Sequence, residues 1–271
     1  MSIIPNMRAI FKPVQPLIQH ADTGVQYKEY WPDEHLQSLI YCYWELYTTV
    51  PLLQDFLYRV VADGCMDIFF DRRNPSDAYV MGFSDRYTAF PVGRDFHYIG
   101  IRFLPTMFPQ LFNVQAHELA QQATLLQDVI PQTAKFLASS NIEVVDMSAI
   151  MEQLDAHFLR ILLQREIKID TRLYESLEKI MKADTHLHIE KDLQEGISAR
   201  QLRRLFERYI GDTPKTFQKI VRFQKMLQGK PSHQALRRHL HYLDAGYYDQ
   251  AHFIKEFKTL YGLTPNKVFE K

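Results

Sequence analysis

Apolar residues in the last hundred positions recur every three or four residues, a pattern that predicts amphipathic helices. In "YYDQAHFIKEFKTLY" (247–261) one helical stripe collects the apolar residues, namely Phe253, Ile254, Phe257, Leu260 and Tyr261. The opposite face is small at its start and basic further along, with Ala251, His252, Lys255, Lys258 and Thr259. Such a face suits a helix in a DNA major groove, although an ordinary surface helix looks similar.

The same pattern occurs twice. "GISARQLRRLFERYIGDTPKTF" (196–217) matches "AGYYDQAHFIKEFKTLYGLTPNKV" (245–268) at an offset of 51 residues. Ser198 and Asp249 are good N-caps, and Gln201 completes a capping box with Ser198. Gly211 and Gly262 suit the left-handed position that ends a helix, and a Thr-Pro pair then begins the next helix. Each unit is therefore predicted as a helix, a glycine stop and a new helix.

A short helical segment precedes each of these capped helices, so we expect two helix-turn-helix units at about 186–211 and 234–262. The apolar positions of these short segments are Ile189 and Leu193 in the first unit, and Leu236, Leu240 and Leu243 in the second. Residues 214–228 between the units predict a connecting helix with Phe217, Ile220, Val221, Phe223 and Leu227 on its buried face. This arrangement predicts two recognition helices that enter the major groove about 34 Å apart, one helical turn of DNA.

The first recognition helix has a basic solvent face. Its predicted buried stripe is Leu202, Leu205, Phe206 and Tyr209, which directs Arg200, Arg203, Arg204 and Glu207 toward solvent. The planar fork of arginine binds guanine bidentately or grips phosphate. A single arginine here is equally well explained by solvation or by a salt bridge to Glu207. Because the three arginines cluster on one capped helix, a role in DNA binding is favoured over these alternatives.

These residues carry a family resemblance. "GISARQLRRLFERYIGDTPKTFQKIVRFQKML" together with "AGYYDQAHFIKEFKTLYGLTPNKVF" resembles the DNA-binding domain of the AraC/XylS-type transcription regulators. The resemblance implies two helix-turn-helix units joined by a linker helix, with base contacts from Arg200, Arg203, Arg204, Gln250, Ala251, His252 and Lys255. A Leu-Ala or Ile-Ala pair usually lies in the first helix of each unit in that family, whereas this chain has Lys191-Asp192 and His241-Tyr242.

The N-terminal part has a strand-like pattern of apolar and polar residues in place of the helical one, so the chain is expected to have an α+β fold. Strand-like stretches separated by turn residues occupy 39–48, 56–62, 66–70, 79–84 and 98–103, and helical spacing follows at 116–130 and 147–164. We predict a β-rich sensor or dimerisation domain with a helical tail (1–165; β-rich 25–103, helical 115–165). An all-α DNA-binding domain (171–271) is predicted to follow.

Three N-terminal pieces extend the resemblance to the N-terminal domain of a subgroup of AraC-type regulators: "YWPDEHL", "YRVVADGCMDIFF" and "YIGIRFLP". In that subgroup a proline commonly precedes the Asp-Gly-Cys, where this chain has Ala62, and a glycine follows the last proline, where it has Thr106. The dense aromatic residues here form either a pocket for an apolar or planar ligand or a packed core.

Charge and composition support a two-part chain. The net charge is zero, yet residues 171–271 hold 19 Lys and Arg against 12 Asp and Glu, while the rest holds 13 against 20. A basic C-terminal part suggests a polyanionic partner.

The two cysteines exclude a disulfide framework and a four-cysteine metal site, and buried free thiols are expected. Because no apolar run is long enough to span a bilayer and no signal peptide begins the chain, we expect a cytoplasmic protein without a membrane partner.

Candidate catalytic groups are weak. Asp63, Asp67 and Asp71 share a face of a strand or helix and could hold Mg²⁺ or Ca²⁺, but turn and edge positions explain them more simply. Cys65 has no neighbouring histidine to activate it, and His233, His239 and His241 have no further ligand nearby to complete a metal site. We therefore predict no catalytic residue, no metal and no cofactor.

Three functional hypotheses remain. The first is a sequence-specific transcription regulator that is not an enzyme and that binds double-stranded promoter DNA. RNA polymerase, a small-molecule effector and a second copy of the chain are its further possible partners. The second is a small-molecule-binding or protein-interaction protein whose DNA-binding domain is degenerate, motivated by Lys191-Asp192 and His241-Tyr242. The third is an enzyme with an attached DNA-binding domain.

Overall fold

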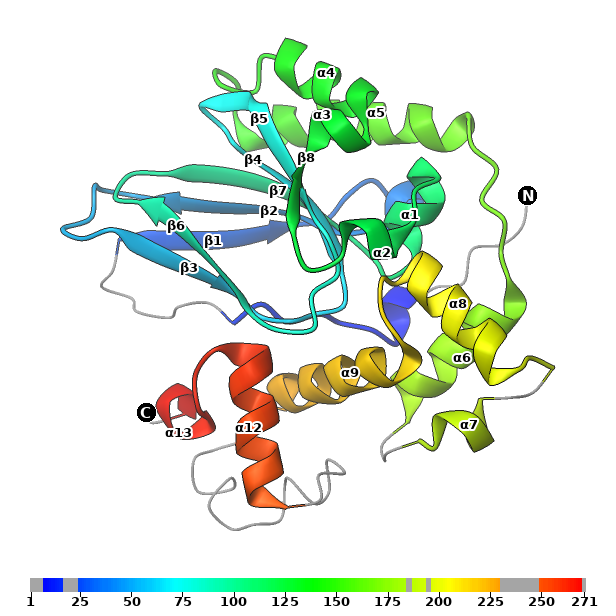
Figure 1. Cartoon of the computed structure of the whole chain (residues 1–271). Helices are drawn as coiled ribbons and strands as arrows, with labels where there is room; N and C mark the ends of the chain where they lie inside the picture. Colours follow the sequence, from blue (N-terminus) through cyan, green and yellow to red (C-terminus); the bar gives the residue numbers. More distant parts are fainter. Residues whose placement is uncertain (1–6, 17–23, 184–186, 194–195, 230–248, 270–271) are drawn as a thin grey trace.

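A β-rich part is followed by a helical part in the computed structural model of the chain (Figure 1). The structure describes residues 7–16, 24–183, 187–193, 196–229 and 249–269. We call residues 25–163 the β-rich part and residues 171–269 the helical part. The expected order of a β-rich region, a helical tail and a helical C-terminal region is confirmed.

Eight strands build the β-rich part within the described residues. They are β1 (Val25–Tyr30), β2 (Ile40–Thr48), β3 (Phe56–Val60), β4 (Met66–Asp71), β5 (Asn74–Met81), β6 (Thr88–Gly93), β7 (His97–Phe103) and β8 (Ala123–Leu125). Six of them form an antiparallel sheet in the order β1-β2-β7-β4-β5-β8, and β3 pairs with β6 in a second sheet. The five predicted strand segments correspond to β2, β3, β4, β5 and β7.

Alternation along the strands gives the large sheet two different faces. In β4, Ile68 and Phe70 are fully buried in the main core, whereas Asp67 and Phe69 point to the opposite face. The core face is covered by helices that include α1 (Met107–Phe112) and α5 (Met147–Leu163), whose buried side chains belong to the same cluster. The other face turns toward the β3-β6 sheet (Figure 1). Polar and aromatic side chains of several strands line the space between the two sheets.

The segment after the sheet corrects one expectation. Residues 116–130 were expected to be helical throughout, and this is wrong: α2 (Ala116–Leu119) and α3 (Leu126–Val129) are separated by strand β8. Gln121 adopts a left-handed backbone (φ 65°), which ends the helical path. Pairing of β8 with the edge strand β5 then outweighs the local three-to-four spacing. Helix α4 (Pro131–Ser139) and α5 follow, and α5 confirms the helix expected at 147–164.

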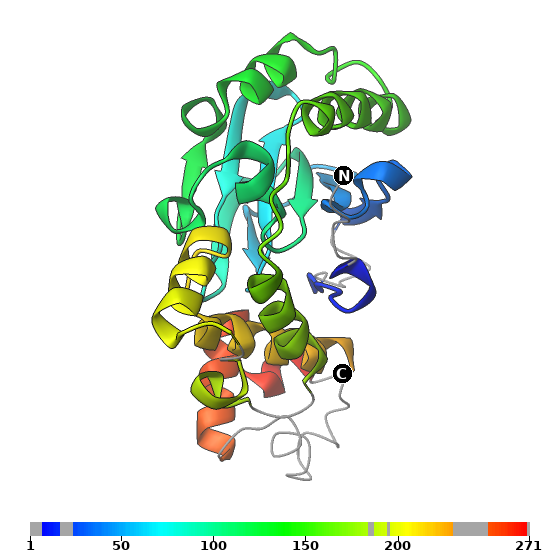
Figure 2. The same ribbon diagram turned by 90° about the vertical axis from the view of Figure 1, so that its right-hand side faces the viewer.

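The helical part begins with α6 (Thr171–Lys182), which the 164–170 connection joins to α5 along one side of the molecule (Figure 2). The further helices are α7 (Ile189–Asp192), α8 (Ala199–Tyr209), α9 (Pro214–Gln228), α12 (Gln250–Tyr261) and α13 (Pro265–Phe269). Helix α9 matches the predicted connecting helix, with Phe217, Ile220, Val221, Phe223 and Leu227 all buried. The short helix expected around Leu236, Leu240 and Leu243 lies outside the described residues.

Two short 3₁₀ helices, η1 (Met7–Ala9) and η2 (Glu34–Leu36), complete the elements. Cys42 and Cys65 are buried free thiols, as expected. Within the described ranges, no helix combines the length and apolar character that crossing a membrane requires.

Candidate nucleic-acid interface

Helix α8 begins and ends where the sequence predicts. The backbone N–H of Gln201 donates to Ser198 Oγ at 3.3 Å, and the backbone N–H of Ser198 donates to Gln201 Oε1 at 3.1 Å, which completes the capping box. At the other end Gly211 has a φ of 109°, a conformation that few other residues adopt. These local signals fix which face of the helix meets the core.

The basic face of α8 is open to solvent. Leu202 and Phe206 are fully buried, and Leu205 and Tyr209 are half-buried beside them. The predicted contact residues Arg200, Arg203 and Arg204 are all exposed. Arg203 Nε donates to Glu207 Oε1 at 3.0 Å across one helical turn, an exposed pair that adds little stability. Three guanidinium groups are thus presented on one helix face.

The unusual Lys191-Asp192 pair leaves the core of the first unit apolar. Both side chains are exposed on α7, while Leu193 and Ile197, on either side of the turn, are buried in the main core. The corresponding His241-Tyr242 pair of the second unit lies outside the described residues.

Helix α12 repeats this construction. The Asp249 carboxylate accepts from the backbone N–H of His252 at 2.7 Å, and Gly262 ends the helix with a φ of 89°. Phe253, Phe257 and Leu260 are buried, and Phe257 stacks on Tyr261 with ring centroids 5.2 Å apart. Ile254 corrects the predicted stripe, because its side chain is 37% exposed.

Glu256 is buried beside the apolar stripe of α12, although helical spacing alone does not predict that it is buried. Its Oε1 accepts from Arg222 Nη2 of α9 at 2.6 Å, and both side chains are largely shielded from solvent. A charged pair between α9 and α12 fixes how the two helices cross, since either charge would be costly to bury alone.

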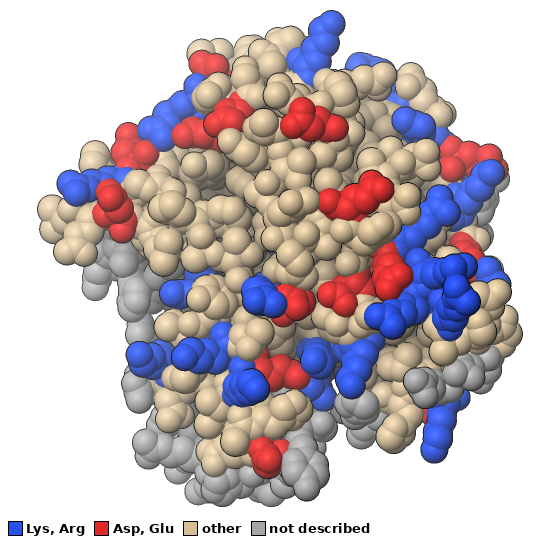
Figure 3. Space-filling model, in the orientation of Figure 1, with Lys and Arg blue, Asp and Glu red and all other residues tan. Residues whose placement is uncertain are grey.

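The predicted contact face of α12 is exposed. Gln250, Ala251, His252 and Lys255 lie together on the side away from the core, and His252 Nε2 is 3.8 Å from Glu256 Oε2. In Figure 3 many Lys and Arg side chains gather in the lower half of the view, over α8, α9 and α12. The basic C-terminal part of the chain thus has a basic surface around both capped helices.

Both capped helices also contact the β-rich part. The backbone N–H groups of Ala62 and Tyr87 donate to the carbonyls of Leu260 and Thr259 at 3.1 and 3.0 Å, at the C-terminal end of α12. Helix α8 packs against α1 and α2. A Cβ at Gly211, just after α8, would approach Phe83 Cβ to 3.0 Å. The β-rich part therefore touches the ends of both candidate recognition helices.

The aspartates considered as metal ligands have another role. Asp67 Oδ2 is 3.0 Å from Arg102 Nη2, Asp63 Oδ2 is 3.3 Å from Arg102 Nε, and Asp71 pairs with Arg73 at 2.9 Å. Asp63 lies in the turn before β4, where it accepts from the backbone N–H of Cys65 at 2.9 Å, while Asp67 lies within β4, and both carboxylates are partners of the buried Arg102. The described residues contain no group of three or more side chains arranged to hold a metal ion.

The sequence could not reveal the Arg102 cluster, because strand pairing brings together residues 35 or more positions apart.

Burial raises the pKa of Cys65 well above its ordinary value, so its thiol is not an activated nucleophile. His233, His239 and His241 lie outside the described residues.

Comparisons with known proteins agree with this division. Residues 194–271 match the family model described as a helix-turn-helix domain, and residues 28–124 match a domain of unknown function, DUF6597. No curated protein matches the chain.

Among solved structures, a variant of apo ToxT from Vibrio cholerae is 11% identical, covers 92% of this chain and 98% of its own, and has a TM-score of 0.41. Unsaturated fatty acid bound ToxT is 9% identical over 81% of this chain and 96% of its own, also with a TM-score of 0.41. Another ToxT structure has a TM-score of 0.44 at 8% identity, over 91% of this chain and 98% of its own.

Two matched domains thus make up much of the chain. Residues 194–271 are a helix-turn-helix domain of the AraC type, and residues 28–124, before it, are a DUF6597 domain.

Proposed function

We propose that the chain is a sequence-specific regulator that reads two major-groove segments with α8 and α12, under the control of the β-rich part. Arg200, Arg203 and Arg204 contact DNA from α8, and Gln250, Ala251, His252 and Lys255 contact DNA from α12. The observation that carries the proposal is that two N-capped helices pack by their apolar faces around α9 while presenting these polar and basic faces to solvent.

Control by the β-rich part is supported by where it touches the helical part. The backbone of residues 62 and 87 binds the end of α12, and α1 and α2 support α8. Since both proposed recognition helices contact the β-rich part, its position determines the spacing between them. A movement of the β-rich part would therefore change the relative positions of the two helices that read DNA.

The described arrangement restrains DNA binding. A groove beside α12 is lined by Asp85 of the β-rich part together with Lys219, His252 and Lys255 of the helical part. The β5–β6 segment stands at one wall of the groove, where Asp85 is paired with Arg86, so a phosphate backbone that approaches these cations meets the β-rich part. Full engagement of α12 therefore requires the β-rich part to move away.

Hydrogen bonds of the Gln224 side chain hold α9 both to the N-terminal segment and to the β-rich part. Gln224 Oε1 accepts from the backbone N–H of Val14 at 2.6 Å, and Gln224 Nε2 donates to the carbonyl of Ala62 at 2.8 Å. Gln224 is fully buried, so these bonds are shielded from water. They join the connecting helix of the DNA-binding domain to the same segment, residues 61–65, that contacts α12.

The output of such a regulator is recruitment or exclusion of RNA polymerase at a promoter in the cytoplasm, and a homodimer would read a longer operator. The test of the proposal is selection of bound duplexes from a random DNA library with the purified full-length chain, followed by a salt titration of the selected duplex. We expect an enriched sequence and an affinity that falls steeply with salt, because each neutralised phosphate releases counterions. Binding without sequence preference would contradict the proposal.

A further inference from the structure

A cavity of about 430 Å³ lies between the two sheets of the β-rich part. Its walls are rich in aromatic side chains, namely Trp44, Tyr58, Phe69, Tyr79, Phe90 and Tyr98. Phe69 stacks on Tyr79 at 5.7 Å and meets Phe90 edge to face at 5.6 Å between ring centroids. The volume is that of a small-molecule site, and faces of aromatic rings attract cations as well as apolar groups.

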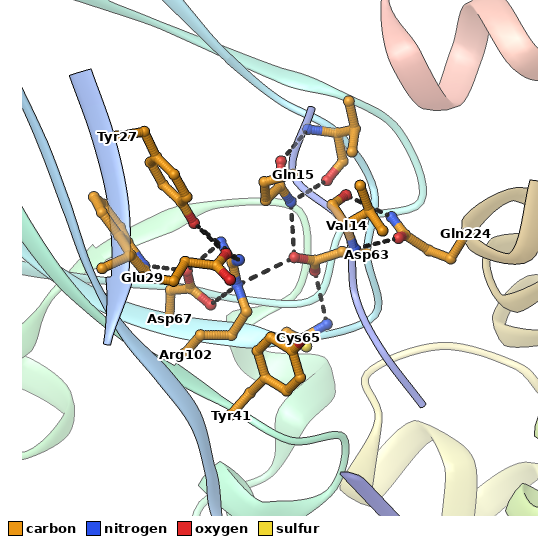
Figure 4. Close-up of polar contacts among 12 residues, drawn as sticks. Val14, Gln15, Tyr27, Glu29, Tyr41, Asp63, Cys65, Asp67, Arg102 and Gln224 are labelled. Carbon is orange, nitrogen blue, oxygen red and sulfur yellow. Dashed lines mark hydrogen bonds and ion pairs between the residues drawn. The ribbon is translucent and has the colours of Figure 1, made fainter. Parts of the chain in front are cut away.

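Arg102 lies at one end of this cavity, and each of its three side-chain nitrogens has a hydrogen-bond partner (Figure 4). Its Nε and Nη2 donate to the two oxygens of Asp67 at 3.3 and 3.0 Å, and Nη1 donates to the hydroxyl of Tyr27 at 3.3 Å. Only 1% of the Arg102 residue surface is accessible. An anionic ligand would have to displace a carboxylate to reach the guanidinium, so this end is poorly suited to anions.

The same end carries more negative than positive charge. Asp63 and Asp67 both line the cavity and share the single guanidinium of Arg102, and the carboxylate of Glu29 is 3.6 Å from Arg102 Nη1. Burial and the neighbouring Asp63 carboxylate raise the pKa of Asp67 to about 6, against the opposing effect of Arg102. A cationic group nearby would neutralise this surplus charge.

Two of the other charged side chains of the wall have partners of opposite charge: Asp71 pairs with Arg73 at 2.9 Å, and Arg86 pairs with Asp85 at 2.8 Å. Asp77 also lines the cavity, but it is exposed to solvent. The buried surplus of negative charge therefore lies at the Asp63 and Asp67 end, next to Trp44, whose Nε1 donates to Asp67 at 2.8 Å.

We propose that this cavity binds an organic cation, an amine or quaternary ammonium on an aromatic or apolar body, with the charge at the Asp63 and Asp67 end and the body among the aromatic rings. The role of this molecule as the effector rests on the proposed function above. Ligand recognition itself depends only on the cavity.

The position of the cavity explains how occupancy would reach the DNA-binding helices. Asp63 Oδ2 accepts from Gln15 Nε2 at 2.7 Å, and the Gln15 side chain bonds the backbone of Val61, while the adjacent Val14 bonds Gln224 of α9 (Figure 4). Val61, Ala62 and Asp63 line the cavity, as do Arg86 and Thr88 on either side of Tyr87, which bonds α12. A ligand that moves either segment changes the contacts of α9 and α12.

The test is isothermal titration of the full-length chain, without DNA, with three probes of matched size: tryptamine (a cation), tryptophol (neutral) and indoleacetate (an anion). We expect tryptamine to bind at least ten-fold more tightly than tryptophol and indoleacetate to bind most weakly. Asp67→Asn should remove the advantage of tryptamine and leave tryptophol binding within about two-fold.

Because Asp67→Asn also removes a partner of Arg102, a second variant, Phe90→Leu, keeps an apolar wall but loses a ring face. We expect it to weaken tryptamine several-fold more than tryptophol. Indoleacetate binding as tightly as tryptamine, equal effects of Phe90→Leu on the two probes, or no binding of any probe would overturn the proposal. None of these results bears on the duplex selection, and failure of that selection leaves the titration valid.

Discussion

The backbone N–H of Ala62 donates to the carbonyl of Leu260 at 3.1 Å. Ala62 lines the cavity of the β-rich part, and Leu260 is a buried residue of helix α12. One hydrogen bond thus connects the wall of a ligand-sized cavity directly to a helix that we propose reads DNA. Its neighbours on both sides belong to the same interface, with Tyr87 bonded to Thr259 and Gln224 bonded to Ala62.

Loosening this interface should strengthen DNA binding. Gln224→Ala removes the side chain that joins α9 to Val14 and Ala62, and leaves those backbone groups without this partner. We expect the affinity of the full-length chain for its selected duplex to rise roughly five-fold or more, in the range of typical coupling between sites. Fluorescence anisotropy with labelled duplex measures this, and Gln132→Ala, an exposed change on α4, is the control. A folded Gln224→Ala chain with unchanged or weaker binding would speak against restraint.

Each recognition helix should supply base-specific affinity. Arg204→Ala on α8 or Lys255→Ala on α12 should weaken binding to the selected duplex by about 1 to 3 kcal/mol and relax the preference at one base pair. Competition among single-base variants of the duplex measures both effects. Arg94→Ala, an exposed arginine of the β-rich part, should change neither. An equal loss on every sequence would assign the side chain to phosphate instead of a base.

The core of the second unit depends on Phe257. This fully buried ring contacts Phe223, Phe253 and Tyr261 at centroid distances of 5.6, 5.8 and 5.2 Å. Phe257→Ala should lower the free energy of unfolding by about 3 to 5 kcal/mol, measured by urea denaturation. Ile254→Ala on the exposed side of α12 should cost no more than about 0.5 kcal/mol. Similar losses in the two variants would refute the assigned orientation of the helix.

Acid sensitivity should arise from His157 in α5. Burial, with a smaller effect of Arg160, lowers the pKa of His157 to about 4, and its ring is stacked on Phe136 and 3.1 Å from Thr133 Oγ1. The unfolded chain therefore binds the proton first. This contribution to stability is complete above the unfolded pKa, about 6.5, and is lost as the pH falls through the window toward 4.

The test of this dependence is thermal or urea unfolding between pH 7 and pH 4. The wild type should lose about 1 to 3 kcal/mol from this residue across the window, and His157→Gln should show a flatter pH dependence. His117→Gln, an exposed change on α2, should leave the slope as in the wild type. If His157→Gln and the wild type share one slope, another group is responsible.

What the sequence revealed about the helical part was local information. The Ser198 and Gln201 capping box, the Asp249 cap and the left-handed Gly211 and Gly262 each depend on residues a few positions apart, and all are present in the structure. The exposed placement of Ile254 was missed because the edge of a helical stripe depends on what packs against it. Here Glu256 gains a buried place through Arg222 of another helix.

What the sequence concealed was non-local. Strand β8 forms only because β5 offers an edge some 45 residues away, and helical spacing in 116–130 carries no trace of that partner. Pairing of β4 with β7 places Arg102 opposite Asp67, and the turn before β4 brings Asp63 to the same guanidinium, which the spacing of the aspartates in the sequence does not indicate. The cavity and the contact between Ala62 and Leu260 likewise require the tertiary fold.

The central claim, that α8 and α12 read separate segments of one site, is tested most directly by hydroxyl-radical footprinting of the selected duplex with the wild type, Arg204→Ala and Lys255→Ala. We expect the wild type to protect two segments about 34 Å apart, one helical turn. Each variant should lose protection at one segment and retain it at the other. A single protected segment that both variants weaken alike would contradict the claim.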